Sequence, residues 1–92
     1  MDDKIAALTT ELTELQVRLN DPAIFQSRDY PKLAKRQAWL ETAINTHAEI
    51  QKLASQITEN KQLVEEGGDL ADLARDELPE LETNLQTSKP VS

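Results

Sequence analysis

The sequence has no cysteine and only one histidine, His47, among its 92 residues. The missing thiols exclude disulfide bridges, thiolate metal sites and cysteine nucleophiles. A single histidine excludes a two-histidine metal site within one chain. Aromatic residues number three and glycines two. Because strands are rich in aromatic and β-branched residues, this composition favours an all-α protein over a sheet protein.

Long apolar runs are absent as well. No stretch approaches the roughly 18 apolar residues of a membrane-spanning helix, and the acidic start of the chain, Met1–Lys4, lacks the apolar core of a signal peptide. We therefore expect a soluble, cytoplasmic chain with no membrane partner. With 92 residues, the core is expected to be a helix-to-helix seam that encloses no small-molecule substrate.

Leucine and isoleucine recur at helical spacing near the start of the chain. Intervals of three and four residues place five of them on one narrow stripe of a helix expected over residues 3–20. They are Ile5, Leu8, Leu12, Leu15 and Leu19. The helix is expected to end near Asn20, because the residue before Pro22 is disfavoured in the α region.

Prolines frame the start of a second helix. Asp21 is expected to cap a short turn that opens with Pro22, with Ile24 and Phe25 closing the end of the core. Pro31 suits the first turn of a helix, because its missing N–H would be unpaired there. No proline or glycine interrupts the chain from there to Glu66, which predicts a helix over 31–66, ~54 Å long. Its wide apolar stripe predicts contact with two neighbouring helices.

A third helix is predicted over residues 69–86. Gly67-Gly68 provides the left-handed conformation that ends the preceding helix, and Asp69 is expected to cap the next one. Pro79 lies inside this segment and predicts a kink or a restart. The predicted buried stripe comprises Leu70, Leu73, Ala74, Leu78, Leu81 and Leu85.

These three segments predict the architecture. We expect residues 1–86 to form one all-α domain, an elongated antiparallel three-helix bundle of coiled-coil character with a long central helix. Residues 87–92 lose the helical periodicity, and they are expected to be a tail or a linker to a missing downstream domain.

The net charge of −7 is concentrated in one segment. Residues 59–82 carry nine acids against two bases, whereas the rest of the chain carries eight of each. Four bases near the start of the second helix form a basic end: Arg28, Lys32, Lys35 and Arg36. Four cations in an acidic chain are too few to predict independent nucleic-acid binding, although they could contact a few phosphates within a larger complex. The simpler interpretation is a solvated helix surface.

No arrangement of residues predicts catalysis. His47 lies on the apolar stripe of the second helix and is expected to be a half-buried structural residue. Ser55 is two turns away on the same helix, so no nucleophile and base are paired. The carboxylates are expected to be solvated, since a thin bundle offers no cleft that would perturb their pKa values. We therefore expect no enzyme activity, no cofactor and no metal site.

Several segments, in their order and spacing, resemble one family. They are Asp21-Pro22, Tyr30, Lys32-Leu33-Ala34-Lys35, Leu40 and the stretch from Leu73 to Glu82. Together they resemble the N-terminal helical domain of bacterial class I peptide chain release factors, closest to the release factor 1 group, over about residues 5–85. The family-motif positions are Asp21, Pro22, Tyr30, Lys32, Leu33 and Lys35. The chain departs from the family pattern at Arg36-Gln37, where an acid commonly follows the lysine, and at Gly67-Gly68, where an Asp-Pro turn is common.

The resemblance implies a role in translation termination as part of a larger factor. In the family, the full-length factor recognises a stop codon on the ribosome and releases the peptide through a Gly-Gly-Gln loop. This chain has no Gly-Gly-Gln sequence, so it is expected to be non-catalytic. The implied partners are the stalk base of the large ribosomal subunit and the methyltransferase that modifies the glutamine, both in the context of the full-length factor. The candidate contacts are Arg28, Lys32, Lys35 and Arg36.

A competing interpretation is a stand-alone helical scaffold or adaptor that self-associates. The leucine seam of residues 3–20 could pair between chains as readily as within one chain. The two interpretations predict different oligomeric states, since the scaffold requires a dimer or larger assembly and the release-factor domain does not.

Overall fold

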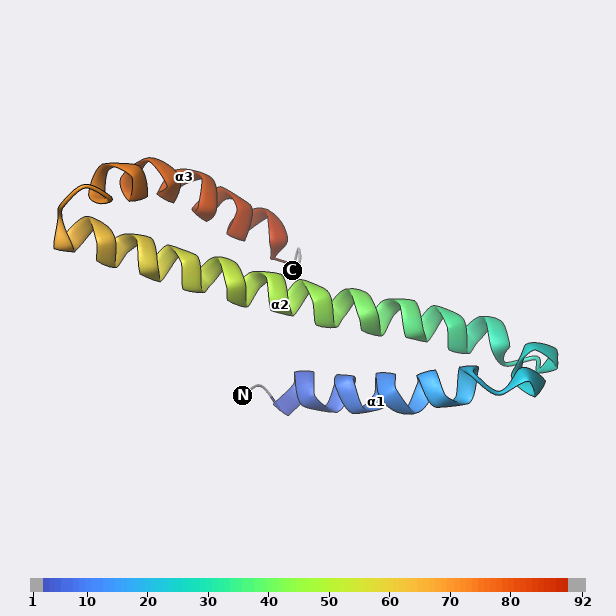
Figure 1. Cartoon of the computed structure of the whole chain (residues 1–92). Coiled ribbons are helices and arrows are strands. Elements are labelled where there is room, and N and C mark those ends of the chain that lie inside the picture. Colours follow the sequence, from blue (N-terminus) through green and yellow to red (C-terminus); the bar gives the residue numbers. More distant parts are fainter. Residues whose placement is uncertain (1–2, 90–92) are drawn as a thin grey trace. The chain divides into compact units, whose positions relative to one another are not determined.

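The computed structural model describes residues 3–89, and every regular element in that range is a helix. In chain order these are α1 (Asp3–Leu19), the short 3-10 helix η1 (Pro22–Gln26), α2 (Tyr30–Glu66) and α3 (Ala71–Ser88) (Figure 1). The predicted all-α fold class with a long central helix is confirmed.

The chain divides into two compact units, Met1–His47 and Ala48–Ser92. The first unit contains α1, η1 and the first half of α2, and the second contains the remainder of α2 and α3. Within each unit, α2 runs antiparallel to the neighbouring helix (Figure 1). The two neighbours predicted for α2 are therefore α1 in one unit and α3 in the other.

The core of the first unit is a narrow seam between α1 and α2. Leu15 of α1 is 6% exposed and Leu40 of α2 is fully buried. The other four members of the predicted α1 stripe are half-buried: Ile5, Leu8, Leu12 and Leu19. The three-four spacing thus identified the packed face of α1 correctly, because residues at these intervals lie on one side of a helix.

The core of the second unit contains Leu53 and Ile57 of α2 and Ala71 and Ala74 of α3. The predicted burial of two leucines was wrong, since Leu70 is 57% exposed and Leu73 is 58% exposed. The stripe instead passes through Ala71 and Ala74 at three-four spacing, and Leu70 and Leu73 each precede one of these positions by one residue, about 100° around the helix. The packed stripe, buried or half-buried, therefore consists of Ala71, Ala74, Leu78, Leu81 and Leu85.

A polar contact also joins the two helices of the second unit. The Asn60 side-chain amide donates to the backbone carbonyl of Ala74 at 3.4 Å and to a carboxylate oxygen of Glu77 at 3.1 Å. Asn60 is half-buried, so these bonds supply partners to an amide that the helix packing partly removes from water.

The turn between α2 and α3 depends on its two glycines. Gly67 and Gly68 have φ values of +72° and +91°, in the left-handed region that the sequence predicted. The predicted cap at Asp69 was wrong, because the helix begins later and its N-cap residue, Leu70, makes no side-chain capping bond. The first turn is instead joined to the glycine turn through the backbone, where the Ala71 N–H donates to the Gly68 carbonyl at 3.2 Å.

Pro79 lies inside a continuous α3, so the helix does not restart there. The ribbon of α3 is curved along its length (Figure 1). The helix also continues to Ser88, which makes two residues of the expected tail, Thr87 and Ser88, helical. Residues 90–92 of that tail lie outside the described range.

The longest helix, α2, has 37 residues, and charged and polar side chains are distributed along it. Within residues 3–89, no helix combines the length and the apolar character that a membrane crossing requires.

Candidate functional site

The connection between α1 and α2 is held by two side-chain caps. The Ala23 N–H donates to the Asp21 carboxylate at 3.0 Å, and Pro22 occupies the first position of η1. The Asp29 N–H donates to the Ser27 hydroxyl oxygen at 3.1 Å, immediately before α2 begins. The predicted Asp21 cap is confirmed. Because the Asp21 carboxylate is used by the backbone, the Asp-Pro pair serves here to shape the turn.

Two aromatic rings lie at this end of the unit. The ring centroids of Phe25 and Tyr30 are 4.9 Å apart with an interplanar angle of 53°. Tyr30 and Ile24 are half-buried, whereas Phe25 is 59% exposed. The prediction that Phe25 would close the core was therefore wrong, since Phe25 packs against the Tyr30 ring and keeps much of its surface in solvent. Leu33 is half-buried on the following turn of α2.

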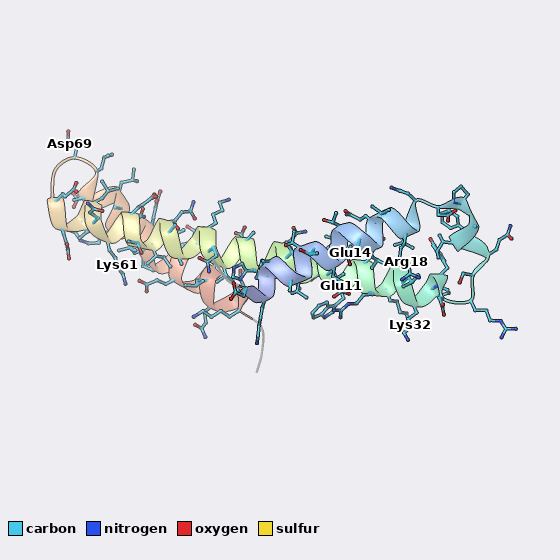
Figure 2. The ribbon with its side chains drawn as sticks, turned by 90° about the horizontal axis from the view of Figure 1, so that it is seen from below. Glu11, Glu14, Arg18, Lys32, Lys61 and Asp69 are labelled. Carbon is cyan, nitrogen blue, oxygen red and sulfur yellow. The ribbon has the colours of Figure 1, made fainter. Side chains whose placement is uncertain are left out.

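The four candidate basic residues fall into two groups. Arg28, Lys32 and Lys35 are exposed, and within residues 3–89 none of them forms an ion pair. Figure 2 shows Lys32 on α2 and Arg18 on α1, both near the end of the first unit at which η1 joins the two helices. Arg28, Lys32 and Lys35 therefore leave positive charge available at the surface of the first unit.

Arg36 differs from the other three because its charge is already paired. Its guanidinium donates to both carboxylate oxygens of Glu11, from Nε at 2.5 Å and from Nη2 at 2.8 Å. These hydrogen bonds hold the pKa of Glu11 below its ordinary value and raise the pKa of Arg36. The guanidinium carbon also lies 4.6 Å from the centroid of the Trp39 ring, which is 52% exposed. Arg36 therefore packs against one face of the exposed Trp39 ring, and its charge is already used by Glu11.

An open hollow of about 480 Å³ lies beside the aromatic pair. We name it the amide hollow, because three of its lining residues carry side-chain amides. Its lining consists of Gln16, Leu19, Asn20, Phe25, Tyr30 and Gln37. None of the three amides takes part in a hydrogen bond within residues 3–89. The hollow thus presents unused donors and acceptors next to aromatic surface.

The charge around the amide hollow contrasts with that of the whole chain. Residues 11–37, which include the paired Glu11 and Arg36, carry five bases against four acids, while the chain as a whole has a net charge of −7. This end is therefore suited to an anionic partner that also offers hydrogen-bonding groups. No group of three metal-binding side chains is found in the described part of the chain.

Sequence reasoning anticipated some of this site and missed the rest. It identified the four bases and the turn residues Asp21 and Pro22. It did not anticipate that Glu11 pairs with Arg36, since 25 residues separate them and no local pattern links them. It also missed Gln16 and Gln37, because two isolated glutamines on different helices carry no spacing signal before the register of α1 against α2 is known.

Comparison with known proteins gives a consistent result. Residues 8–91 match the PCRF domain family. Over 89 residues the chain is 27% identical to peptide chain release factor 1 of Clostridium tetani (strain Massachusetts / E88), covering 94% of this chain and 25% of that protein. Over 93 residues it is 28% identical to peptide chain release factor 1 of Clostridium botulinum (strain Alaska E43 / Type E3), covering 97% and 26%.

A third relative, peptide chain release factor 1 of Clostridium botulinum (strain Eklund 17B / Type B), is 32% identical over 68 residues, which cover 73% of this chain and 19% of the relative. The chain thus spans about a quarter of the length of the first two of these relatives. No solved structure matches the chain.

Proposed function

Because this chain belongs to the PCRF domain family, we propose that it acts as the non-catalytic N-terminal domain of a peptide chain release factor in translation termination. The match over residues 8–91 is the observation that carries the proposal, since it covers most of the first unit and nearly all of the second. The similarity to proteins named peptide chain release factor 1, over nearly the whole chain, supports the same function. This function places the protein in the cytoplasm.

The residues present support a binding role rather than a catalytic one. The resemblance to class I release factors assigns peptide release to a Gly-Gly-Gln loop, and this sequence has no such tripeptide. Its only glycine pair, Gly67-Gly68, forms the left-handed turn before α3 and is followed by Asp69. The domain would therefore contribute contacts, while release depends on another part of the factor.

The ribosome is the partner that we propose for the basic end of the first unit. Arg28, Lys32 and Lys35 support this, because they are exposed and form no ion pair with any residue from 3 to 89, in a chain whose net charge is −7. The family resemblance points to the stalk base of the large subunit as the contact. It also points to docking of the methyltransferase that modifies the release-loop glutamine, for which no residue of this chain is assigned.

Co-sedimentation with ribosomes over a series of salt concentrations tests the proposed contact. The variant Lys32→Glu/Lys35→Glu should bind less tightly than the wild type and should show a shallower salt dependence, because cations that neutralise phosphates release counterions. The matched control is Lys52→Glu/Lys61→Glu, which changes the charge equally at two exposed lysines of the second unit. Equal losses in both variants, or no binding by the wild type at low salt, would contradict the proposed basic contact.

The self-associating scaffold remains the alternative, and exposed apolar side chains such as Val17, at 68% exposure, are the observation that favours it. Sedimentation equilibrium separates the two functions. A monomer at all concentrations supports the release-factor domain, whereas an obligate dimer supports the scaffold. The release-factor domain requires no second copy, since Leu15 and Leu40 are already buried within one chain.

A further inference from the structure

Two exposed leucines lie at the start of α3. Leu70 keeps 57% of its surface in solvent and Leu73 keeps 58%. Five large apolar side chains are exposed within residues 3–89, and these two are the only ones that lie one helical turn apart in sequence. The backbone of Leu70 is already in the right-handed helical region, with φ −89° and ψ −9°. Both leucines therefore lie on the same side of the helix and form an apolar pair at the surface of the second unit.

Leu70 occupies a position at which leucine is unfavourable. It is the N-cap residue of α3, and it makes no side-chain capping bond. Serine, threonine, aspartate and asparagine are preferred at this position, because their side-chain oxygens accept hydrogen bonds from the first N–H groups of the helix. Leu70 gives up that stabilisation and is not buried in return. The packing of α3 does not account for this leucine, which favours a role in contact with another molecule.

Three carboxylates continue the same side of α3. Asp76 and Glu77 follow Leu73 by three and four residues, and Glu80 follows it by seven. Side chains at these intervals share one side of a helix, and all three are exposed. We name this surface the leucine-acid face, and it consists of Leu70, Leu73, Asp76, Glu77 and Glu80. Asp76 and Glu80 form no hydrogen bond or ion pair within the described part of the chain.

The two cations of residues 59–82 do not lie on this face. Arg75 follows Leu73 by two residues, which places it on the opposite side of α3, and it pairs with Asp72 at 2.8 Å. On α2, the Asn60 amide donates to Glu77 and so marks the side of α2 next to the leucine-acid face. Lys61 follows Asn60 by one residue and points about 100° away from it around α2. The carboxylates of the face are therefore available to cations of a partner.

These features restrict the kind of partner. Residues 59–82 carry nine acids against two bases, and this charge repels RNA and anionic lipid surfaces. A free metal ion or a small soluble cation would leave the leucines exposed to water. A helix with apolar side chains along one side and lysines or arginines beside them satisfies both the leucines and the carboxylates.

We propose that the leucine-acid face binds a basic amphipathic helix of another protein. The two leucines pack against the apolar side of that helix, and the three carboxylates pair with the lysines or arginines that flank it. The turn beside the face leaves room for such a partner, since no atom lies within 4 Å of the position that a Cβ would occupy at Gly67 or Gly68. The proposal does not depend on the proposed function, because it is derived from the second unit alone.

A second copy of this chain is a poorer partner for the face. Two copies that each carry a net charge of −7 repel one another. The basic end of a second copy also offers fewer free cations than its sequence indicates, since Arg36 is already paired with Glu11. A basic helix from another protein meets neither obstacle.

Titration of the complete chain with a designed peptide tests the proposal. The probe is a leucine-lysine peptide of about 18 residues with its leucines at helical spacing, and the control probe is a scrambled peptide of the same composition. Backbone nuclear magnetic resonance signals of residues 69–80 are followed. We expect the amphipathic peptide to shift these signals in a saturable way and the scrambled peptide to bind about tenfold more weakly. Equal binding of both peptides, or shifts confined to other residues, would overturn the proposal.

A variant of the two leucines separates binding from folding. Leu70→Asn/Leu73→Gln should bind the amphipathic peptide about tenfold more weakly, because the apolar contact is lost. It should melt no lower than the wild type, since asparagine is favoured at an N-cap and glutamine is a good helix former. The control Val17→Gln removes an exposed apolar side chain from the first unit and should bind like the wild type. Unchanged peptide binding by a folded Leu70→Asn/Leu73→Gln variant would contradict the proposal.

A second variant tests the carboxylates without touching the leucines. Asp76→Asn/Glu80→Gln should bind the peptide several-fold more weakly at low salt and show a shallower salt dependence. The matched control Glu14→Gln/Glu41→Gln removes the same charge at two exposed positions of the first unit. Equal losses in the two variants would mean general attraction to an acidic chain and would refute a specific face.

Sedimentation of the chain alone examines the second-copy alternative. We expect no self-association that depends on the leucines. A dimer that Leu70→Asn/Leu73→Gln abolishes would assign the face to a second copy and overturn the proposal. The proposed function is scored by ribosome binding, so a chain that binds ribosomes but not the peptide would retain that function and lose this inference.

Discussion

Arg36 of α2 and Glu11 of α1, which are 25 residues apart in sequence, form a bidentate ion pair that joins the two helices. The same guanidinium lies against the face of Trp39, so one arginine fixes both the partner helix and an exposed ring. The side chain of Arg36 remains 44% exposed and that of Glu11 42% exposed. Because exposed ion pairs add little to stability, this pair is expected to fix the register of α1 on α2 more than to stabilise the fold.

The ion pair predicts a specific acid dependence. Because the folded-state pKa of Glu11 lies below its ordinary value of 4.5, the stabilisation is fully present above that value and is lost as the pH falls through the folded-state pKa. Glu11→Gln should therefore lower the melting temperature at neutral pH, and the difference from the wild type should shrink below about pH 4.5. Thermal melts at several pH values measure this. A difference that is constant down to strongly acidic pH would contradict it.

Leu40 is the fully buried side chain of the first unit, so its truncation should be the most damaging change there. Leu40→Ala should lower the free energy of unfolding by about 2–5 kcal/mol, through lost burial and a residual cavity. The control Val17→Ala, at a side chain that is 68% exposed, should change it by less than about 0.5 kcal/mol. If Leu40→Ala leaves no folded protein, Leu40→Met should still fold, with a loss below about 1.5 kcal/mol.

Gly67 is expected to resist a side chain for conformational reasons alone. Its φ is +72°, yet no atom lies within 4 Å of the position that a Cβ would occupy. Gly67→Ala should therefore destabilise the protein by about 1–2 kcal/mol through backbone strain, without a clash. Gly67→Asn should be less damaging, since asparagine adopts the left-handed region more readily. Urea unfolding compares the two variants, and equal losses would contradict the conformational explanation.

Pro79 should limit the stability of α3. As a proline it donates no hydrogen bond to the Arg75 carbonyl, although the helix continues through this position. Pro79→Ala should raise the free energy of unfolding by about 1–3 kcal/mol, because it restores a donor at an exposed site. Glu80→Ala, at the exposed neighbour, should change it by less than about 0.5 kcal/mol. A Pro79→Ala variant of lower stability would show that the proline fits the curvature of α3.

The sequence was most informative where local chemistry decides the structure. The three-four spacing from Ile5 to Leu19 identified the packed face of α1, and Asp21 caps η1 as predicted. The left-handed glycines were anticipated for the same reason, because a positive φ is a property of the residue itself. Each of these features is determined by residues within one turn of the chain.

Features that depend on where one element meets another were less predictable. Leu70 and Leu73 resembled core residues in sequence, but the packed stripe of α3 passes through Ala71 and Ala74, each one residue further along, and leaves both leucines exposed. Likewise, Phe25 packs on Tyr30 instead of entering the core. The Glu11 pair and the amide hollow depend on the register between α1 and α2, which no local pattern encodes. The division into one helical domain and a tail stays a prediction.

Peptide release by a chimeric factor tests the central proposal most directly. In the chimera, this chain replaces the matching segment of peptide chain release factor 1 from Clostridium tetani, and a factor that lacks the segment provides the lower limit. We predict that the chimera releases peptide at a stop codon with an apparent ribosome affinity close to that of the parent, and that the isolated chain releases none. A folded chimera with no higher affinity than the factor that lacks the segment would contradict the proposed function.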